Sequence, residues 1–190
     1  MKFNNKKISN LFLVSVGICI LDQISKFVIQ KVMYEGQSIK VLGNLFKLSF
    51  YYNQNGAFGI PVQKILPFLH PTFFYCLFMI IAILLLLTMF KKSYEQGFLN
   101  GLALSLILGG ALGNFIDRVI FGRVVDFLDA DFINIHIAPF EFLFLHFPGY
   151  YMDRWPTFNI ADSSITCGIT LLIIVSFKVS KTYGKKDDQH

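Results

Sequence analysis

Two aspartates, Asp126 and Asp162, carry the chemistry that this sequence suggests most strongly. Two carboxyl groups a few ångströms apart cannot both ionise cheaply, so the pKa of one rises and the pKa of the other falls. The ionised carboxylate removes a proton from water, and the protonated one donates to a scissile carbonyl oxygen. The two residues therefore indicate an aspartic peptidase. The structural alternative is an ion pair between Arg123 and Asp126, which would leave Asp162 as the protonated member.

Further polar residues fall into clusters near the ends of apolar segments. The clusters are residues 22–26, 53–59, 110–118, 124–127 and 158–163. Asp22 and Lys26 are four residues apart, so on a helix they share one face. Charged groups at membrane depth need partners. Asp22, Lys26 and Asp117, together with Arg118, are therefore expected to form a structural polar network.

Two other chemistries fit the sequence less well. A metal site could draw on His70, His136, His146, Glu141 and Asp129, but their spacing is irregular and no HExxH motif is present. A serine–lysine pair could use Ser25 and Lys26, yet neighbouring side chains on a helix point apart. Ser163 and Ser164 follow Asp162 without a basic neighbour. Neither a metal nor an organic cofactor is expected.

The composition indicates which elements position these residues. The chain is 54% hydrophobic and 15% charged, with a mean hydropathy of +0.56, which is too apolar for an ordinary soluble domain. A bilayer needs roughly 20 mainly apolar residues per helix. Four stretches meet this need: residues 8–32, 65–90, 98–121 and 158–179. We expect a mainly α, single integral membrane domain over residues 1–190 with four transmembrane helices.

The first apolar stretch also resembles a secretory signal that ends at a cysteine. The residue before Cys19 is Ile18, where cleavage needs a small side chain, and the helical pattern continues beyond it, so we expect a retained span. Cys76 and Cys167 also lie inside predicted spans. Three cysteines in apolar helices predict no disulfide framework.

Lysines beside the spans predict the orientation. They are Lys2, Lys6, Lys7, Lys91, Lys92, Lys178, Lys181, Lys185 and Lys186. Because basic residues favour the cytoplasmic side, both termini are expected there, with residues 33–64 and 122–157 outside. The net charge of +5 is thus an orientation signal, and no basic aromatic stripe suggests nucleic acid.

The two outer segments differ in pattern. Residues 38–60 alternate in a way typical of strands and predict a small periplasmic β element. Residues 126–155 are rich in aromatic rings, which favour the headgroup level of a bilayer. We expect an amphipathic loop on the outer leaflet there.

The clusters, in this order, resemble the bacterial lipoprotein signal peptidase family, also called signal peptidase II. The residues that carry the resemblance are Asp22-Gln23, Ser25-Lys26, Gly113-Asn114, Asp117-Arg118, Val125-Asp126-Phe127 and Asn159-Ile160-Ala161-Asp162-Ser163. The family's asparagine between the first two spans maps onto Asn53, with Asn55 as the alternative. The outer loop over residues 128–156 is long for the family.

The resemblance implies a function for these positions. It implies cleavage of prolipoproteins before a diacylglyceryl-modified cysteine, at the outer face of the bacterial cytoplasmic membrane, with Asp126 and Asp162 catalytic. Site-supporting or substrate-binding residues would be Asn53, Asn114, Arg118, Asn159 and Ala161. Membrane lipid and globomycin-like inhibitors would be partners of a monomer. The competing functions are a small transporter, whose polar residues would be spread through the spans, and an envelope scaffold, which would not need either aspartate.

Overall fold

The computed structural model describes residues 5–54, 70–95, 97–142 and 145–187. Within these residues the helices are α1 (Asn5–Val32), α3 (Pro71–Glu95), α4 (Phe98–Phe121) and α5 (Ile160–Asp187). Each contains a stretch long and apolar enough to cross a membrane: Asn10–Val32, Thr72–Met89, Phe98–Phe121 and Ile160–Lys178. The prediction of a mainly α membrane fold with four spanning helices is confirmed. The second predicted span starts at residue 65, and residues 65–69 lie outside the described ranges.

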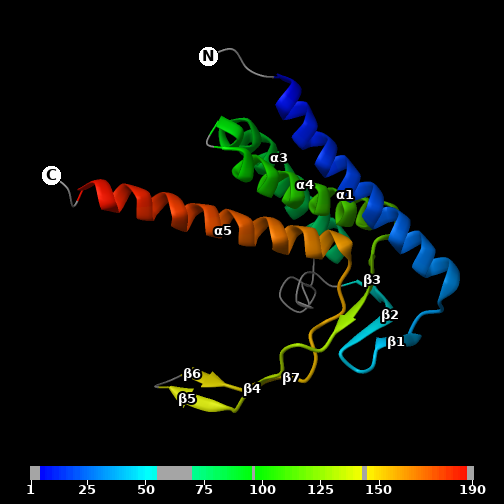
Figure 1. Cartoon of the computed structure of the whole chain (residues 1–190). Helices are drawn as coiled ribbons and strands as arrows, with labels where there is room; N and C mark the ends of the chain where they lie inside the picture. The colour runs from blue at the N-terminus through cyan, green and yellow to red at the C-terminus, as the bar shows by residue number, and fades with distance from the viewer. Residues whose placement is uncertain (1–4, 55–69, 96, 143–144, 188–190) are drawn as a thin grey trace.

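Helix α4 lies at the centre of the bundle. It packs against α1, α3 and α5 (Figure 1). In its apolar stretch 56% of the residues are buried, against 6% in that of α3. The side chains of α3 therefore face lipid on most sides, whereas α4 presents its residues to the other helices.

Glycines of α4 let the neighbouring helices approach closely. A Cβ atom on Gly109 would lie 2.7 Å from the carbonyl oxygen of Ser15, and one on Gly113 would lie 2.6 Å from Oδ2 of Asp22. On the other side, a Cβ atom on Gly110 would collide with the carbonyl oxygen of Ala161. Small residues at these crossings bring α1 and α5 near enough for their polar side chains to meet.

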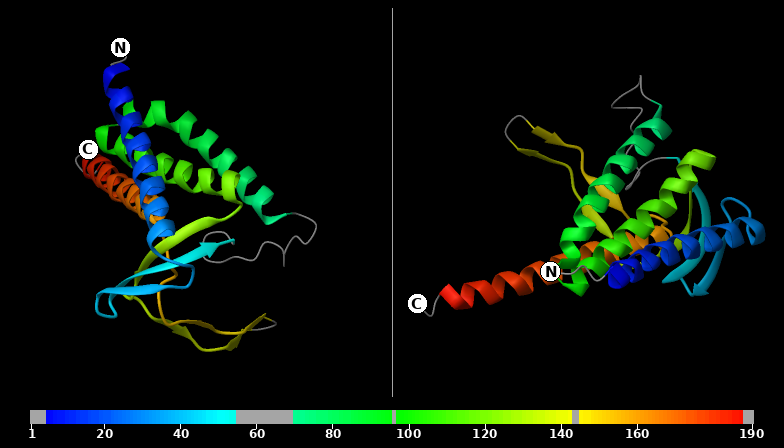
Figure 2. Two further views of the ribbon diagram at one scale, coloured as in Figure 1. Left: turned by 90° about the vertical axis from the view of Figure 1, so that its right-hand side faces the viewer. Right: turned by 90° about the horizontal axis from the view of Figure 1, so that it is seen from above.

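A three-stranded antiparallel sheet lies at one end of the helices. Its strands are β1 (Ser38–Leu42), β2 (Phe46–Asn53) and β3 (Val124–Ala130), in the order β1-β2-β3 (Figure 2). The predicted β element covered residues 38–60, of which residues 55–60 lie outside the described ranges. The sequence did not predict that the segment after α4 adds the third strand. That strand places Asp126 opposite Tyr51 of β2.

Apolar packing fixes the sheet against the end of α1. Ile29 and Met33 form a buried cluster with Phe50 of β2 and with Val125 and Phe127 of β3. Val125 and Phe127 flank Asp126 in the sequence. The strand therefore buries one face in this cluster and turns the Asp126 side chain the other way, toward the helices.

Residues beyond β3 form two short antiparallel pairs. The strands are β4 (Ile135–Ile137), β5 (Phe140–Phe142), β6 (Leu145–Phe147) and β7 (Tyr150–Met152). Strand β4 pairs with β7, and β5 pairs with β6. In Figures 1 and 2 these pairs form an arm that extends sideways from the sheet. The expected amphipathic loop thus contains short strands.

Candidate active site

Asp126 and Asp162 come from elements that meet at the end of the bundle beside the β1-β2-β3 sheet. Asp126 lies in the middle of β3, and Asp162 lies in the first turn of α5. Asn159 precedes α5 and caps it: the Asp162 N–H donates to Asn159 Oδ1 at 3.0 Å, and the Asn159 N–H donates to Asp162 Oδ2 at 3.2 Å. This reciprocal capping fixes the direction of the Asp162 carboxyl group.

Asparagine side chains hold both carboxyl groups. The fully buried Asn159 donates from Nδ2 to Asp126 Oδ1 at 2.8 Å. Asn53 Nδ2 donates to Asp126 Oδ2 at 2.9 Å, and Asn114 Nδ2 donates to Asp162 Oδ1 at 2.8 Å. All four carboxyl oxygens therefore accept a hydrogen bond from an asparagine, and Asn159 contacts both carboxyl groups. The alternative residue Asn55 lies outside the described residues.

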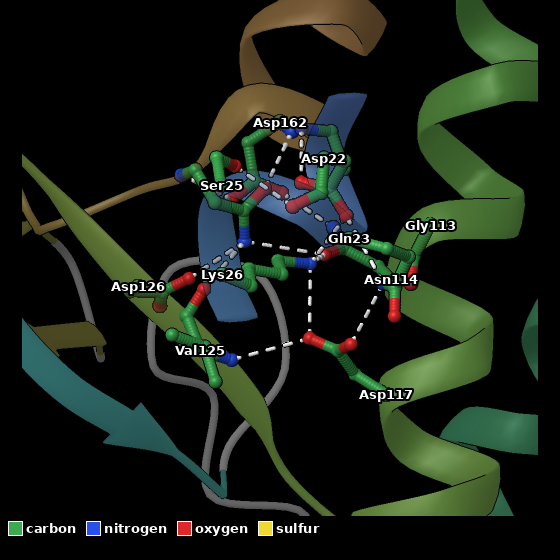
Figure 3. A network of polar contacts seen from close by, with 12 residues as sticks. Asp22, Gln23, Ser25, Lys26, Gly113, Asn114, Asp117, Val125, Asp126 and Asp162 are labelled. Atoms are coloured by element: carbon green, nitrogen blue, oxygen red, sulfur yellow. Dashed lines mark hydrogen bonds and ion pairs between the residues drawn. The ribbon is translucent and has the colours of Figure 1, made fainter. Parts of the chain in front are cut away.

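Lys26 organises the charges behind this pair. Its Nζ lies 2.7 Å from Asp22 Oδ2, 2.9 Å from Asp117 Oδ2 and 2.9 Å from Asn114 Oδ1. An ammonium group has three N–H donors, so each has an acceptor. Because Asn114 turns its oxygen toward Lys26, its amide nitrogen faces Asp162 (Figure 3). The cation thus orients a donor of the site from another helix.

The two carboxylates bound to Lys26 also contact the backbone beside the catalytic candidates. Asp22 Oδ1 accepts from the N–H of Ala161 at 2.9 Å, and Asp117 Oδ2 accepts from the N–H of Val125 at 3.3 Å. Val125 and Ala161 immediately precede Asp126 and Asp162. The network therefore joins α1 and α4 to both elements that carry the aspartates.

Arg118 and Arg123 each lie on an aromatic ring. The guanidinium carbon of Arg118 is 4.5 Å from the ring centroid of Tyr75 on α3, and its charge acts on Asp126 and Asp162. The guanidinium carbon of Arg123 is 3.4 Å from the ring centroid of Tyr52. Among the ion pairs of the described residues, none joins Arg123 to Asp126.

Two contributors, Gln23 and Tyr75, were given no role by the sequence. Gln23 Nε2 donates to the Gly113 carbonyl oxygen at 3.0 Å and to Asp117 Oδ1 at 2.9 Å. Its place next to Asp22 was a usable signal. Tyr75 gave none, because a single aromatic residue in an apolar span is ordinary.

The environment of Asp126 perturbs its acidity. Burial raises the pKa of Asp126 to about 7, and the nearby charge of Asp162 is the next largest cause. The hydrogen bonds from Asn53 and Asn159 and the charge of Lys26 act in the opposite direction. A carboxyl group with this pKa exchanges its proton near neutral pH, which suits a general acid.

The geometry disfavours the serine–lysine alternative. Ser25 Oγ donates to the carbonyl oxygen of Asp22 at 2.7 Å, while Lys26 Nζ contacts Asp22, Asp117 and Asn114 instead of the serine. Ser163 Oγ and Ser164 Oγ likewise donate to backbone carbonyl oxygens.

The histidines of the arm lie in separate pairs. His136 Nε2 is 2.6 Å from Asp153 Oδ1, and His146 Nδ1 is 3.4 Å from Glu141 Oε1. In the described part of the chain, no three of His, Cys, Asp and Glu gather as a metal site.

A family model described as Signal peptidase (SPase) II matches residues 14–178. The chain belongs to the signal peptidase II family. Lipoprotein signal peptidases of Staphylococcus aureus, including that of strain MRSA252, are 35% identical to it over 182 residues, which are 96% of this chain and 95% of theirs. Because the family match covers nearly the whole chain, the chain is an aspartic peptidase of a bacterial membrane. This excludes the transporter and scaffold alternatives.

Two solved structures share the fold. One is described as "Bacterial membrane enzyme structure by the in meso method at 2.3 A resolution"; it is 32% identical, with a TM-score of 0.72 over 92% of this chain and 91% of the other. The second carries the same description at 1.9 Å and is 35% identical, with a TM-score of 0.67 over 90% of this chain and 94% of the other. The signal peptidase II fold therefore extends over nearly the whole chain.

Proposed function

We propose that Asp126 and Asp162 are the catalytic pair with which this peptidase removes signal peptides from prolipoproteins. The observation that carries the proposal is that one residue, Asn159, donates a hydrogen bond to each aspartate. The two aspartates belong to different elements, β3 and α5. Structural carboxylates in a membrane protein pair with cations. These two accept hydrogen bonds from asparagines, with Lys26 behind Asn114 and the charge of Arg118 acting on both.

The two carboxyl groups divide the acid and base roles. Asp126, whose pKa is raised to about 7, holds the proton. Because the pair shares one proton, Asp162 is then the ionised member. Asp162 removes a proton from water, which attacks the scissile carbonyl carbon, while Asp126 donates its proton to the carbonyl oxygen. The proton taken by Asp162 then passes to the leaving amine, and one hydroxyl of the tetrahedral intermediate returns its proton to Asp126 as the carbon–nitrogen bond breaks. The peptide bond breaks with water as the only co-reactant and without an acyl-enzyme.

This assignment predicts the pH dependence of cleavage. As pH rises through about 7, Asp126 loses the proton that it must donate. Cleavage, measured as kcat/KM between about pH 5 and pH 9, should therefore fall about tenfold per pH unit on the basic side.

The variant Asn53→Ala tests whether the pKa of Asp126 sets the basic limb of the pH profile. It removes a hydrogen bond that favours the ionised form of Asp126, so the pKa rises further and the basic limb moves to higher pH. Gln54→Ala, at the exposed neighbouring residue, is the matched control and leaves the limb in place. A basic limb that stays put or moves to lower pH in Asn53→Ala contradicts the assignment of the proton to Asp126.

The substrate side of the proposal is a cysteine that carries a diacylglyceryl group. Both aspartates lie at the end of the bundle that bears the β1-β2-β3 sheet, where acyl chains can remain in the leaflet while the peptide enters the site (Figure 1). The lysines beside the other helix ends favour a cytoplasmic location for both termini and an outer face for the site. The chain would act as a monomer in contact with lipid.

Cleavage of two matched precursors tests this substrate class. The precursors differ only in whether the cysteine after the cleavage site is diacylated, and both are incubated with the full chain in lipid vesicles. The diacylated precursor should be cleaved at least about 100-fold faster, because its acyl chains hold it in the bilayer. Equal rates would rule out recognition of the lipid, whereas inhibition of both reactions by a globomycin-like compound would still support the peptidase site.

A further inference from the structure

The arm formed by residues 135–142 and 145–152 has one apolar and one polar face in its first strand pair. The residues of β4 and β7 on the apolar face are Ile135, Ile137, Tyr150 and Met152. The other face carries His136 opposite Tyr151, and His136 Nε2 lies 2.6 Å from Asp153 Oδ1. Directly opposite residues share a face, so this pair of strands is amphipathic.

The second strand pair repeats this division. Phe140 of β5 lies opposite Phe147 of β6, with ring centroids 4.9 Å apart. Glu141 lies opposite His146, and Glu141 Oε1 is 3.4 Å from His146 Nδ1. Aromatic rings and a polar Glu–His pair thus occupy opposite faces.

Large apolar side chains of this region are exposed. They are Phe132, Ile133, Ile137, Phe140 and Tyr150, each with 43–57% of its surface exposed. A two-stranded sheet is marginal in water, and a cluster of exposed apolar residues on one marks a contact surface. The exposed apolar residues of the arm therefore indicate a contact that covers them.

The base of the arm is fixed to the strand that carries Asp126. An isolated β-bridge between Leu128 and Phe158 joins the chain entering the arm to the chain leaving it. Arg154 pairs with Asp129, and its Nη1 lies 2.9 Å from Asp131 Oδ2. The arm then extends sideways from the sheet (Figures 1 and 2).

The net charge of the arm bears on what the arm can contact. Residues 131–157 contain the acids Asp131, Glu141 and Asp153 and the base Arg154, so their net charge is 1 − 3 = −2 with histidine neutral. A negative segment is repelled by anionic headgroups and by acidic partners. Charge therefore does not draw the arm to anionic headgroups, and its contact with a bilayer rests on the exposed apolar residues.

We propose that the arm lies in the outer leaflet, with its apolar faces against the acyl chains and its polar pairs toward water. Interfacial segments of this kind enter the bilayer by about 5–10 Å. An arm held at this depth keeps β3, and hence the site, at a constant height above the membrane.

Tryptophan fluorescence tests the placement, because Trp155 is the chain's only tryptophan. In a Trp155→Phe background, Tyr150→Trp and Tyr151→Trp put a probe on neighbouring residues of β7 that face opposite ways. The full chain is placed in phosphatidylcholine vesicles with bromine on acyl carbons near the glycerol or near the chain end. Phe78→Trp, on the lipid-facing surface of α3, is the deep control.

Lipid contact predicts opposite results for the two probes. The probe at position 150 should be quenched about twofold more by shallow bromines than the probe at position 151, which aqueous iodide should quench instead. The control at position 78 should respond most to deep bromines. Equal iodide quenching at 150 and 151 without bromine quenching overturns the proposal. Quenching at 150 that varies only with the protein-to-lipid ratio also overturns it, because a second copy would then cover the arm.

Discussion

The variants Asp126→Asn and Asp162→Asn should each lower kcat/KM for signal-peptide cleavage by about 10²–10⁴-fold, the range that general acid–base catalysis contributes. Asparagine keeps the volume of the side chain but neither ionises nor donates a proton to a leaving group. At Asp126 the variant removes the general acid, and at Asp162 it removes the base that activates water. Single-turnover cleavage of a diacylated prolipoprotein in vesicles measures the loss directly.

The matched control for these variants is Asp129→Asn. Asp129 is a buried aspartate of the same strand, three residues beyond Asp126, and it contacts Ser49 and Arg154 instead of Asn159. It should lose less than about tenfold in activity, because its contacts do not reach the reacting atoms. Thermal unfolding of all three variants separates lost chemistry from lost structure. Full cleavage by either Asp126→Asn or Asp162→Asn would remove that residue from the mechanism.

Local patterns in the sequence predicted the helices and the spacing of Asp22 and Lys26. A stretch of apolar residues long enough for a bilayer has few other uses, so the spans followed from length and composition. Asp22 and Lys26 share a helix face at four residues' separation, and the structure gives them a distance of 2.7 Å. Asp126 and Asp162 could be selected as the acidic residues without a basic partner in their clusters.

Contacts between segments that are distant in sequence could not be predicted from local patterns. The pairing of β2 with β3 joins Asn53 to Val124, across two helices, and no local pattern encodes that register. Asn159 looks like an ordinary helix cap, and its second hydrogen bond, to Asp126, exists only because α4 and its glycines bring α5 close to β3. Closeness in sequence can also mislead. Arg123 lies three residues before Asp126, yet its guanidinium group stacks on the ring of Tyr52.

The variant Lys26→Met should destabilise the protein by about 3–5 kcal/mol, the usual cost of removing one partner of a buried ion pair. Lys26 is 3% exposed, Asp22 is fully buried and Asp117 is 2% exposed, so two carboxylates would be left without their cation. Unfolding by heat or by denaturant in detergent measures the change. Lys31→Met, at an exposed lysine of the same helix, is the matched control and should change stability by no more than about 0.5 kcal/mol.

Neutralising the stranded carboxylates separates charge from packing as the cause of this loss. In the triple variant with Lys26→Met, Asp22→Asn and Asp117→Asn no buried charge remains unpaired, so it should be more stable than Lys26→Met alone. It should still cleave more slowly than wild type, because Asn114 loses the cation that turns its amide nitrogen toward Asp162. A triple variant less stable than the single one would mean that Lys26 acts through packing. The orientation of Asn114, and with it the geometry of the catalytic pair, would then need a different origin.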